Sequence, residues 1–247
     1  MKKIICIITA LLAIVFILLS CENKQVQGQE EYNYETINPY DFVGEMHNSG
    51  LNAIRDSLTS TKAAISDELI ESYVASFCEK VFVEDERFSI QDITKADGND
   101  ESAYEEEIVI SEKAESYCKQ IMKITESDDY CRVKEQLLEI EEIIVNQSES
   151  FTEYEKALLL CSIAVGKYSS EYWEQYQAET KSAAGAIVGA DVVGALKGIK
   201  AHAVEIVICG AIGGIGCGLA AAGRAALGPA VASSAVMGVV QAFNAWF

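Results

Sequence analysis

The residues best suited to chemistry in this chain are eight cysteines and two histidines. A cysteine or serine nucleophile needs a base beside it, and the sequence around His47 and His202 marks no such pair. His202 and Glu205 stand three residues apart on an expected helix, but two ligands do not make a metal site. Because no Cys-x-x-Cys motif occurs, a zinc site is not expected either. The sequence therefore predicts a protein that is not an enzyme and that needs no cofactor.

The cysteines beyond the N-terminal segment have two possible states. Four of them stand at or beside apolar positions of expected helices: Cys78, Cys118, Cys131 and Cys161. They allow three disulfide pairings, or they are buried free thiols, and the sequence leaves both possibilities open. Cys209 and Cys217 are eight residues apart, which in one straight helix is about 12 Å and too far for a disulfide.

The N-terminal segment has the features of an export signal. Two lysines precede an uncharged run of 16 residues from Ile4 to Leu19, and the letters LLSC follow at residues 18–21. This ending resembles the lipobox of bacterial lipoproteins, in which the signal peptide is cut just before an acylated cysteine. The resemblance implies that residues 1–20 are a removed signal peptide and that Cys21 carries fatty-acyl chains such as palmitate. The alternative is a retained transmembrane helix, although a span needs roughly 17–25 apolar residues.

An acylated Cys21 implies a location in the bacterial cell envelope, with membrane lipid as the partner and the outer membrane as the expected membrane. Residues 21–38 are mostly polar and lack periodicity, so we expect them to be a flexible tether.

Charge and glycine are distributed very unevenly along the chain. The formal net charge is −19, with −22 on residues 21–182 and +1 on residues 183–247. The second part holds 12 of the 17 glycines. An acidic surface repels nucleic acid, so a DNA or RNA partner is not expected. The chain therefore divides into an acidic domain at residues 39–178 and a glycine-rich apolar tail at residues 179–247.

The acidic domain is predicted to be an all-α bundle of about five helices, because helical periodicity recurs without a strand pattern of useful length. The expected helices cover residues 40–60 and regions around 69–81, 110–122 and 133–144, followed by a last helix that contains residues 157–161, with a loop at 94–103. Ser150 and Glu153 resemble a capping box that opens the last helix. That helix is apolar on every face at residues 157–161, so it is expected to be the central buried one.

The segment NPYDFVGEMHNSGL at residues 38–51 differs from the rest. It resembles an opening segment of Bacteroidetes lipoproteins, of the form NPYD-x-x-GE-x-HN-x-GL, and this resemblance implies no activity. Asn38 or Asp41 could cap a helix, and His47 and Asn48 could be buried polar groups that fix its packing. The alternative is a binding site.

The tail is predicted to form a Gly/Ala-rich apolar helical hairpin. Ile206–Gly223 and Ala225–Phe247 contain no charged residue, so Arg224 is expected at or near the tip. Spacing of four between small residues lets helices approach closely. It occurs in three pairs: Gly185 and Gly189, Gly194 and Gly198, and Gly214 and Gly218. Trp246 is placed to lie at a membrane interface.

The composition and spacing of the tail resemble the glycine-rich membrane-active segments of two-peptide bacteriocins and the hydrophobic hairpins of pore-forming toxins. This resemblance implies that the tail associates with or inserts into a membrane. Two alternatives are homo-oligomerisation or partner docking through the tail, and packing of the tail within its own chain. Because residues 183–247 are so apolar, they cannot lie exposed in water and must contact lipid, a partner or their own chain.

Overall fold

In the computed structural model, the described residues all belong to one compact unit. The structure describes residues 38–61, 65–90, 108–176 and 184–239, without the side chains of Ala184, Gly185 and Val239. The expected signal peptide, Cys21, the tether before Asn38, the loop at 94–103 and Trp246 lie outside the described residues.

The described residues form helices and no strand, so the prediction of an all-α bundle is confirmed. The long helices are α2 (Asp41–Ser60), α3 (Asp67–Glu84), α4 (Glu112–Thr125), α5 (Tyr130–Asn146), α6 (Glu153–Gln175), α8 (Ala184–Ala201) and α9 (Ala203–Ser234). Short helical turns are η1 (Glu86–Phe88), η4 (Ser148–Ser150) and the π-helical η5 (Ala235–Val239).

Side chains that cap free backbone N–H groups determine where several helices begin. The N-caps are Ser66 for α3, Ser111 for α4, Asp129 for α5 and Thr152 for α6. The predicted capping box was two residues early, because Thr152 and Glu155 form it while Ser150 lies in η4. Glu155 also accepts a hydrogen bond from the Ser111 backbone N at 2.7 Å, so a tertiary contact between α4 and α6 supports this choice.

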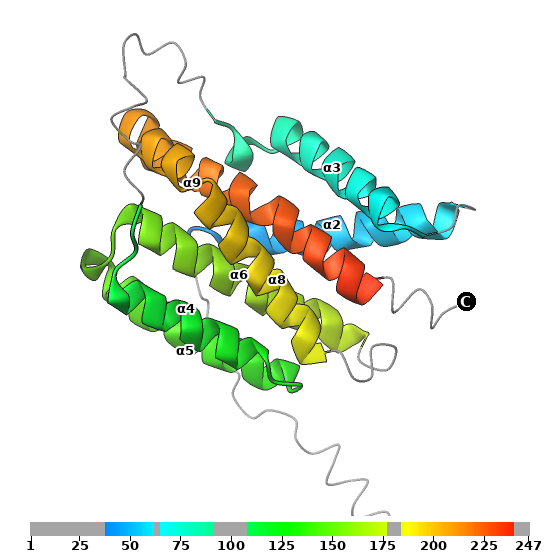
Figure 1. Ribbon diagram of the computed structural model, residues 1–247, viewed down its shortest axis with the longest axis horizontal. Helices are drawn as coiled ribbons and strands as arrows, with labels where there is room; N and C mark the ends of the chain where they lie inside the picture. The colour runs from blue at the N-terminus through cyan, green and yellow to red at the C-terminus, as the bar shows by residue number, and fades with distance from the viewer. Residues whose placement is uncertain (1–37, 62–64, 91–107, 177–183, 240–247) are drawn as a thin grey trace, which may run out of the picture. The chain divides into compact units, whose positions relative to one another are not determined.

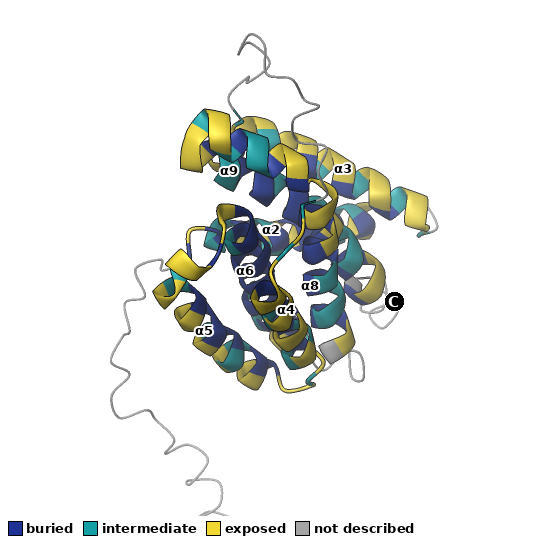
Figure 2. Cartoon of the chain, turned by 60° about the vertical axis from the view of Figure 1, so that its left-hand side comes forward, coloured by how far each residue is buried: buried dark blue, intermediate teal, exposed yellow. Residues whose placement is uncertain are grey.

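Helix α6 is the central element of the fold, as its apolar sequence predicted. Residues 157–161 are all buried, and Figure 2 shows α6 as mostly dark blue. Helices α2, α5, α8 and α9 all pack against it. The acidic and the glycine-rich parts of the sequence therefore share one core.

Helices α8 and α9 pack along each other, as Figure 1 shows, and both contribute buried side chains to the common core. Val192, Ile199, Leu227 and Val231 are fully buried. The described part of the tail therefore packs within its own chain, which was one of the three alternatives considered for it.

Gly198 allows α8 to approach α9 at Pro229. Because proline has no N–H, the Ala225 carbonyl one turn earlier lacks its usual partner in α9. A Cβ on Gly198 would lie only 2.0 Å from that oxygen, so no larger residue fits without moving the helices apart. Gly194 makes the same kind of approach, with 2.6 Å to the Pro229 oxygen.

We expect Gly198→Ala to lower the free energy of unfolding by about 1–3 kcal/mol, because it overpacks the contact between α8 and α9. Gly189→Ala is the matched control in the same helix, since its Cβ would lie 3.7 Å from Thr125. That control is expected to be neutral or to gain up to about 1 kcal/mol from helix propensity. Urea denaturation of both variants checks this, and equal stabilities would contradict the close approach.

Candidate functional site

A buried polar cluster joins the acidic domain to the tail. Asp191 of α8 is fully buried, and its Oδ2 accepts hydrogen bonds from Ser169 Oγ at 2.6 Å and Ser234 Oγ at 2.8 Å. His47 of α2 is also fully buried, with Nε2 at 3.4 Å from the same oxygen. Trp173 Nε1 donates to Ser234 Oγ at 3.1 Å, which extends the cluster to the end of α6. Four helices thus meet at one carboxylate.

The hydrogen bonds around His47 constrain where its protons lie. Asn48 donates through Nδ2 to the Tyr168 carbonyl oxygen at 2.9 Å, so its Oδ1 is the acceptor that faces His47 Nδ1 at 3.1 Å. Nδ1 therefore carries a proton. Nε2 faces the Asp191 carboxylate, so the imidazole of α2 lies beside the carboxylate of α8.

The serine, histidine and aspartate types in this cluster are those of a hydrolase, but their arrangement is different. In a nucleophilic triad the serine hydrogen-bonds to the histidine, which the aspartate orients. Here both serine hydroxyls donate to Asp191 instead. The cluster is also fully buried and lines neither of the two hollows described below. Its chemistry is therefore that of a polar link within the core.

A second buried cluster surrounds Lys167 of α6. Lys167 Nζ lies 2.8 Å from Asp41 Oδ1 and 2.7 Å from Glu141 Oε1. Asn38 donates through Nδ2 to Glu141 Oε1 at 2.6 Å and to the Leu160 carbonyl oxygen at 2.9 Å. Burial raises the pKa of Glu141, while Lys167 and Asn38 oppose that rise. The cluster fixes α2 and α5 to α6.

These two clusters place the NPYD-x-x-GE-x-HN-x-GL segment in the core. Asn38 and Asp41 enter the Lys167 cluster, and His47 enters the Asp191 cluster. Gly44 lies against α6, where a Cβ would be 2.6 Å from the Ala164 oxygen. Asn48 binds the Tyr168 carbonyl of the same helix. In the described structure the segment packs α2 on α6.

Sequence reasoning missed the partners of this segment: Glu141, Lys167, Ser169, Asp191 and Ser234. A signal for two of them is present in the sequence, because Lys167 and Asp191 are isolated charges in apolar helical runs. An isolated charge in a buried run needs a partner. The sequence does not show which partner it takes, since each lies more than 20 residues away.

Helix α9 folds back on itself at Gly214. This glycine has φ 75° and ψ −176°, a combination that almost only glycine adopts, and it separates two helical arms. The turn of the hairpin is thus at Gly214 and not at Arg224. Arg224 instead donates to the carbonyl oxygens of Phe88 and Phe82 at 2.7 and 3.1 Å, which ties α9 to the end of α3.

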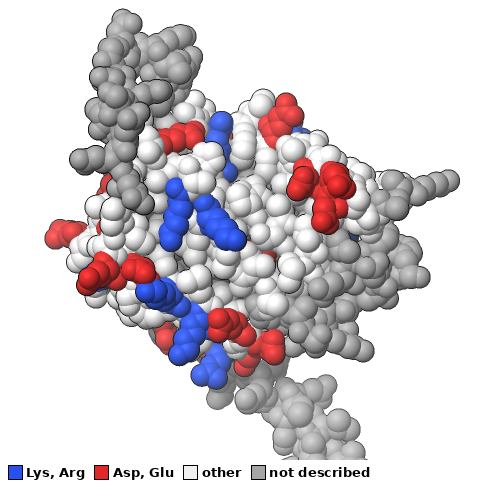
Figure 3. Space-filling model, viewed as in Figure 1, with Lys and Arg blue, Asp and Glu red and all other residues white. Residues whose placement is uncertain are grey.

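The hairpin end exposes Ile212 and Ile215, and Val109 from the segment before α4 lines the same hollow as Ile215. We call these three exposed apolar side chains the tip patch. The exposed fractions of Val109, Ile212 and Ile215 are 81%, 36% and 72%. The hollow beside them has a volume of about 460 Å³ and is lined by mostly apolar residues that include Val109, Ile215 and Leu219. Figure 2 shows the outer turns of α9 in yellow. Figure 3 shows broad white areas on this face, interrupted by a few Lys and Arg side chains in blue.

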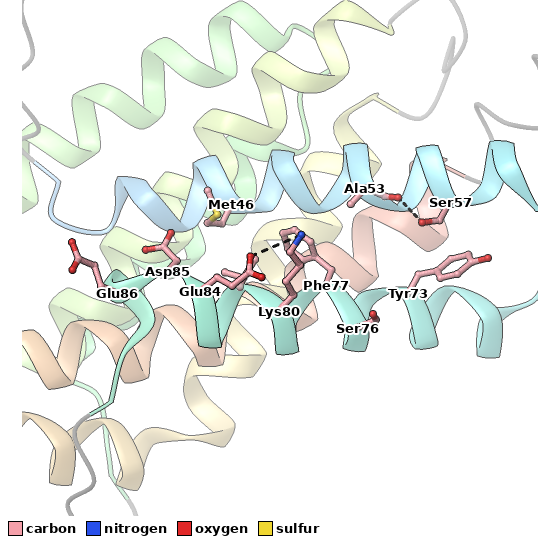
Figure 4. A pocket seen from close by; sticks show the side chains of 11 residues that line it. Met46, Ala53, Ser57, Tyr73, Ser76, Phe77, Lys80, Glu84, Asp85 and Glu86 are labelled. Carbon is pink, nitrogen blue, oxygen red and sulfur yellow. Dashed lines mark hydrogen bonds and ion pairs between the residues drawn. The ribbon is translucent and has the colours of Figure 1, made fainter.

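A second hollow of about 720 Å³ lies between α2 and α3. Figure 4 shows Met46 and Phe77 in its middle and Glu84, Asp85 and Glu86 at one end. Asp85 pairs with Arg87 at 2.8 Å, which holds the pKa of its carboxyl below the usual range. Of the polar side chains in the lining, Ser57 Oγ donates to the Ala53 carbonyl oxygen at 2.8 Å and Lys80 pairs with Glu84 at 3.9 Å.

The remaining predicted site residues have different positions. Gly218 lies against Gly210 across the hairpin, and a Cβ added to Gly218 would lie 3.2 Å from the Gly210 Cα. Gly185 is in α8, and its surroundings lie outside what the structure describes, as do Cys21 and Trp246. The thiols of the six described cysteines are free, and all but Cys131 are buried.

One stretch among the described residues, Ala203–Gly238, has the length and apolar composition of a membrane span. Its 36 residues do not run straight, because Gly214 divides them. Among the described side chains, no group of three or more His, Cys, Asp or Glu is placed to hold a metal ion.

Comparison with known proteins adds no relative. No family model, curated protein or solved structure matches this chain.

Proposed function

We propose that this protein is a non-enzymatic, lipid-anchored protein of the bacterial cell envelope whose tip patch makes a second, shallow contact with a membrane. The observation that supports this second membrane contact is the exposure of Ile212 and Ile215 at the end of a glycine-rich hairpin. Isolated exposed apolar residues are ordinary, but here they adjoin an apolar hollow and an uncharged sequence from Ile206 to Gly223.

The choice of a membrane as the partner rests on the N-terminus. Acylation at Cys21 would hold the chain at a bilayer, and the 17 residues from Cys21 to Ile37 extend at most about 60 Å. The folded unit therefore stays within reach of lipid at all times. One acyl chain binds a membrane only marginally, so a second contact would strengthen the attachment.

The proposal is limited to the tip because most of the tail contributes to the core. Insertion of the whole tail would require Val192, Ile199 and Leu227 to leave their buried positions and would break the contacts of Asp191. A bacteriocin-like activity would need that rearrangement. A shallow contact through the hairpin end leaves the fold unchanged.

Flotation of the mature protein with phosphatidylethanolamine–phosphatidylglycerol vesicles tests the contact, using Cys21→Ser to remove the acyl anchor. We expect this protein to float, and Ile212→Glu/Ile215→Glu to reduce the floating fraction about tenfold, because two isoleucines no longer enter the apolar layer.

The matched control is Ile143→Glu/Val83→Glu, which adds the same charge at exposed positions on α5 and α3. We expect this control to float like its parent. Absence of flotation for the Cys21→Ser parent, or equal loss in both double variants, would contradict the proposal.

The alternative function is an assembly module in which a second copy covers the tip patch. The hollow of about 460 Å³ favours it, because a cavity of that size can receive apolar side chains of a partner. Light scattering without lipid separates the two functions. A dimer that Ile212→Glu/Ile215→Glu dissociates would establish assembly and replace the membrane contact.

A further inference from the structure

The fold of α9 brings together two cysteines that the sequence separates. A Cβ on Gly218 would lie 3.2 Å from the Gly210 Cα and 3.8 Å from the Ile206 oxygen. In a straight helix, residues 206 and 218 would be about 18 Å apart. The two arms of the hairpin are therefore in direct backbone contact just below Gly214.

Cys209 and Cys217 each precede one of these two contacting glycines, so they face each other across the same junction. Both are buried, with 1% and 4% exposed. Both thiols are free. Burial, and after it the neighbouring Cys217 thiol, raises the pKa of Cys209 to about 12. The expectation that they stand about 12 Å apart in one straight helix is thus wrong.

We propose that Cys209 and Cys217 are a disulfide-forming pair, and that a small-molecule or protein disulfide oxidises them to a bond that closes the α9 hairpin. The proposal rests on the geometry of α9 and does not depend on the proposed function.

The reaction is an exchange between thiols and a disulfide. One cysteine thiolate attacks the oxidant RSSR, which forms a mixed disulfide and releases RS⁻. The second thiolate then attacks the cysteine sulfur of the mixed disulfide and releases the second RS⁻. The two protons of Cys209 and Cys217 end on the two RSH molecules. The pair loses two electrons and the oxidant gains them.

The bond would decide which shapes α9 can adopt. Without it, a change of Gly214 to helical dihedral angles would turn Ala203–Gly238 into one continuous apolar helix. With it, the two sulfurs stay bonded, so the arms cannot separate to the about 12 Å that a straight helix requires. Oxidation therefore holds the segment in its hairpin form.

A peptide analysis tests the pair directly. Trypsin is expected to cut after Lys200 and Arg224, so residues 201–224 carry both cysteines and no other. The reduced protein with Cys21→Ser and Cys131→Ser is incubated with oxidised glutathione, alkylated and digested. The masses of the peptides are then measured by mass spectrometry. We expect this peptide to be two hydrogen masses lighter and to carry no alkyl group. A peptide that is alkylated twice, or that carries glutathione, overturns the proposal.

Two glycine variants test the role of the turn. Gly214→Ala is expected to lower the yield of the disulfide roughly tenfold, because a residue with a Cβ disfavours the dihedral angles found there. Gly216→Ala is the matched control, since its Cβ meets no atom within 4 Å and its φ is not positive. We expect it to react like the parent. Equal yields in the two variants would show that the hairpin turn does not create the pair.

Discussion

Replacing Lys167 with methionine is expected to lower the free energy of unfolding by about 3–5 kcal/mol at neutral pH. Lys167 is 6% exposed and lies within 2.8 Å of both Asp41 and Glu141. Methionine fills a similar volume but leaves two neighbouring carboxylates without a cation. A domain of this kind has only about 5–15 kcal/mol of stability in total, so the variant would be close to unfolding.

The loss in Lys167→Met is expected to depend on pH through Glu141. Burial raises the pKa of Glu141 above its ordinary value of 4.5, and Lys167 opposes that rise. Removing Lys167 raises it further. Because the folded protein then binds the proton more tightly than the unfolded chain, the contribution of Glu141 to stability is complete below pH 4.5 and is lost as the pH rises through the raised pKa. The variant should therefore be less impaired at about pH 5 than at about pH 7.5.

Urea denaturation at both pH values, followed by circular dichroism, measures this. Lys134→Met is the matched control, because Lys134 pairs with Glu171 in α6 while both side chains are about two-fifths exposed. Its expected cost is about 0–1 kcal/mol with little pH dependence. If Lys167→Met cost no more than the control, the ion cluster would not hold the helices together.

Asp191→Ala is expected to have an effect of similar size, about 3–5 kcal/mol, which corresponds to a fall of roughly 10 °C in Tm. The change leaves the hydroxyls of Ser169 and Ser234 without their acceptor and removes the carboxylate beside His47 Nε2. Each buried polar group that loses its partner costs about 1–3 kcal/mol. Because Asp191 joins helices of the acidic domain to the tail, the whole unit should unfold in one step.

Asp191→Asn separates hydrogen bonding from charge in this cluster. The amide oxygen still accepts from both serines, so we expect a cost of only about 1–2 kcal/mol. Glu205→Ala is the exposed control in α9, where Glu205 pairs with His202 at 3.1 Å and is about half exposed. It should change the stability by less than about 0.5 kcal/mol. Equal costs for the alanine and asparagine variants of Asp191 would show that its charge carries the whole effect.

The sequence alone predicted the helices well, because periodicity reports which face of a helix is buried. It predicted the first helix over residues 40–60, and α2 covers Asp41–Ser60. It also predicted the central position of α6 from the apolar residues 157–161. It missed the capping box of that helix by two residues, because Glu155 also binds Ser111 of a distant segment. Periodicity does not report such contacts.

The tail shows what composition does not determine. A run rich in glycine and alanine with four-residue spacing fits lipid, a partner or the core equally well, because small residues favour close helix contact of any kind. Only the tertiary structure placed Gly198 against the Ala225 carbonyl that Pro229 leaves without a donor. That contact depends on Gly198 of α8 and on Ala225 and Pro229 of α9, which are far from it in the sequence.

The sequence by itself determined the helical class and the uneven charge, since these follow from local composition and spacing, while the export signal that ends at Cys21 stays a prediction. The tertiary structure decided the turn at Gly214, the meeting of Cys209 with Cys217 and the partners of Lys167 and Asp191. The reason is physical. Each of these depends on which segments the chain brings together when its apolar faces pack, and no local pattern specifies that choice.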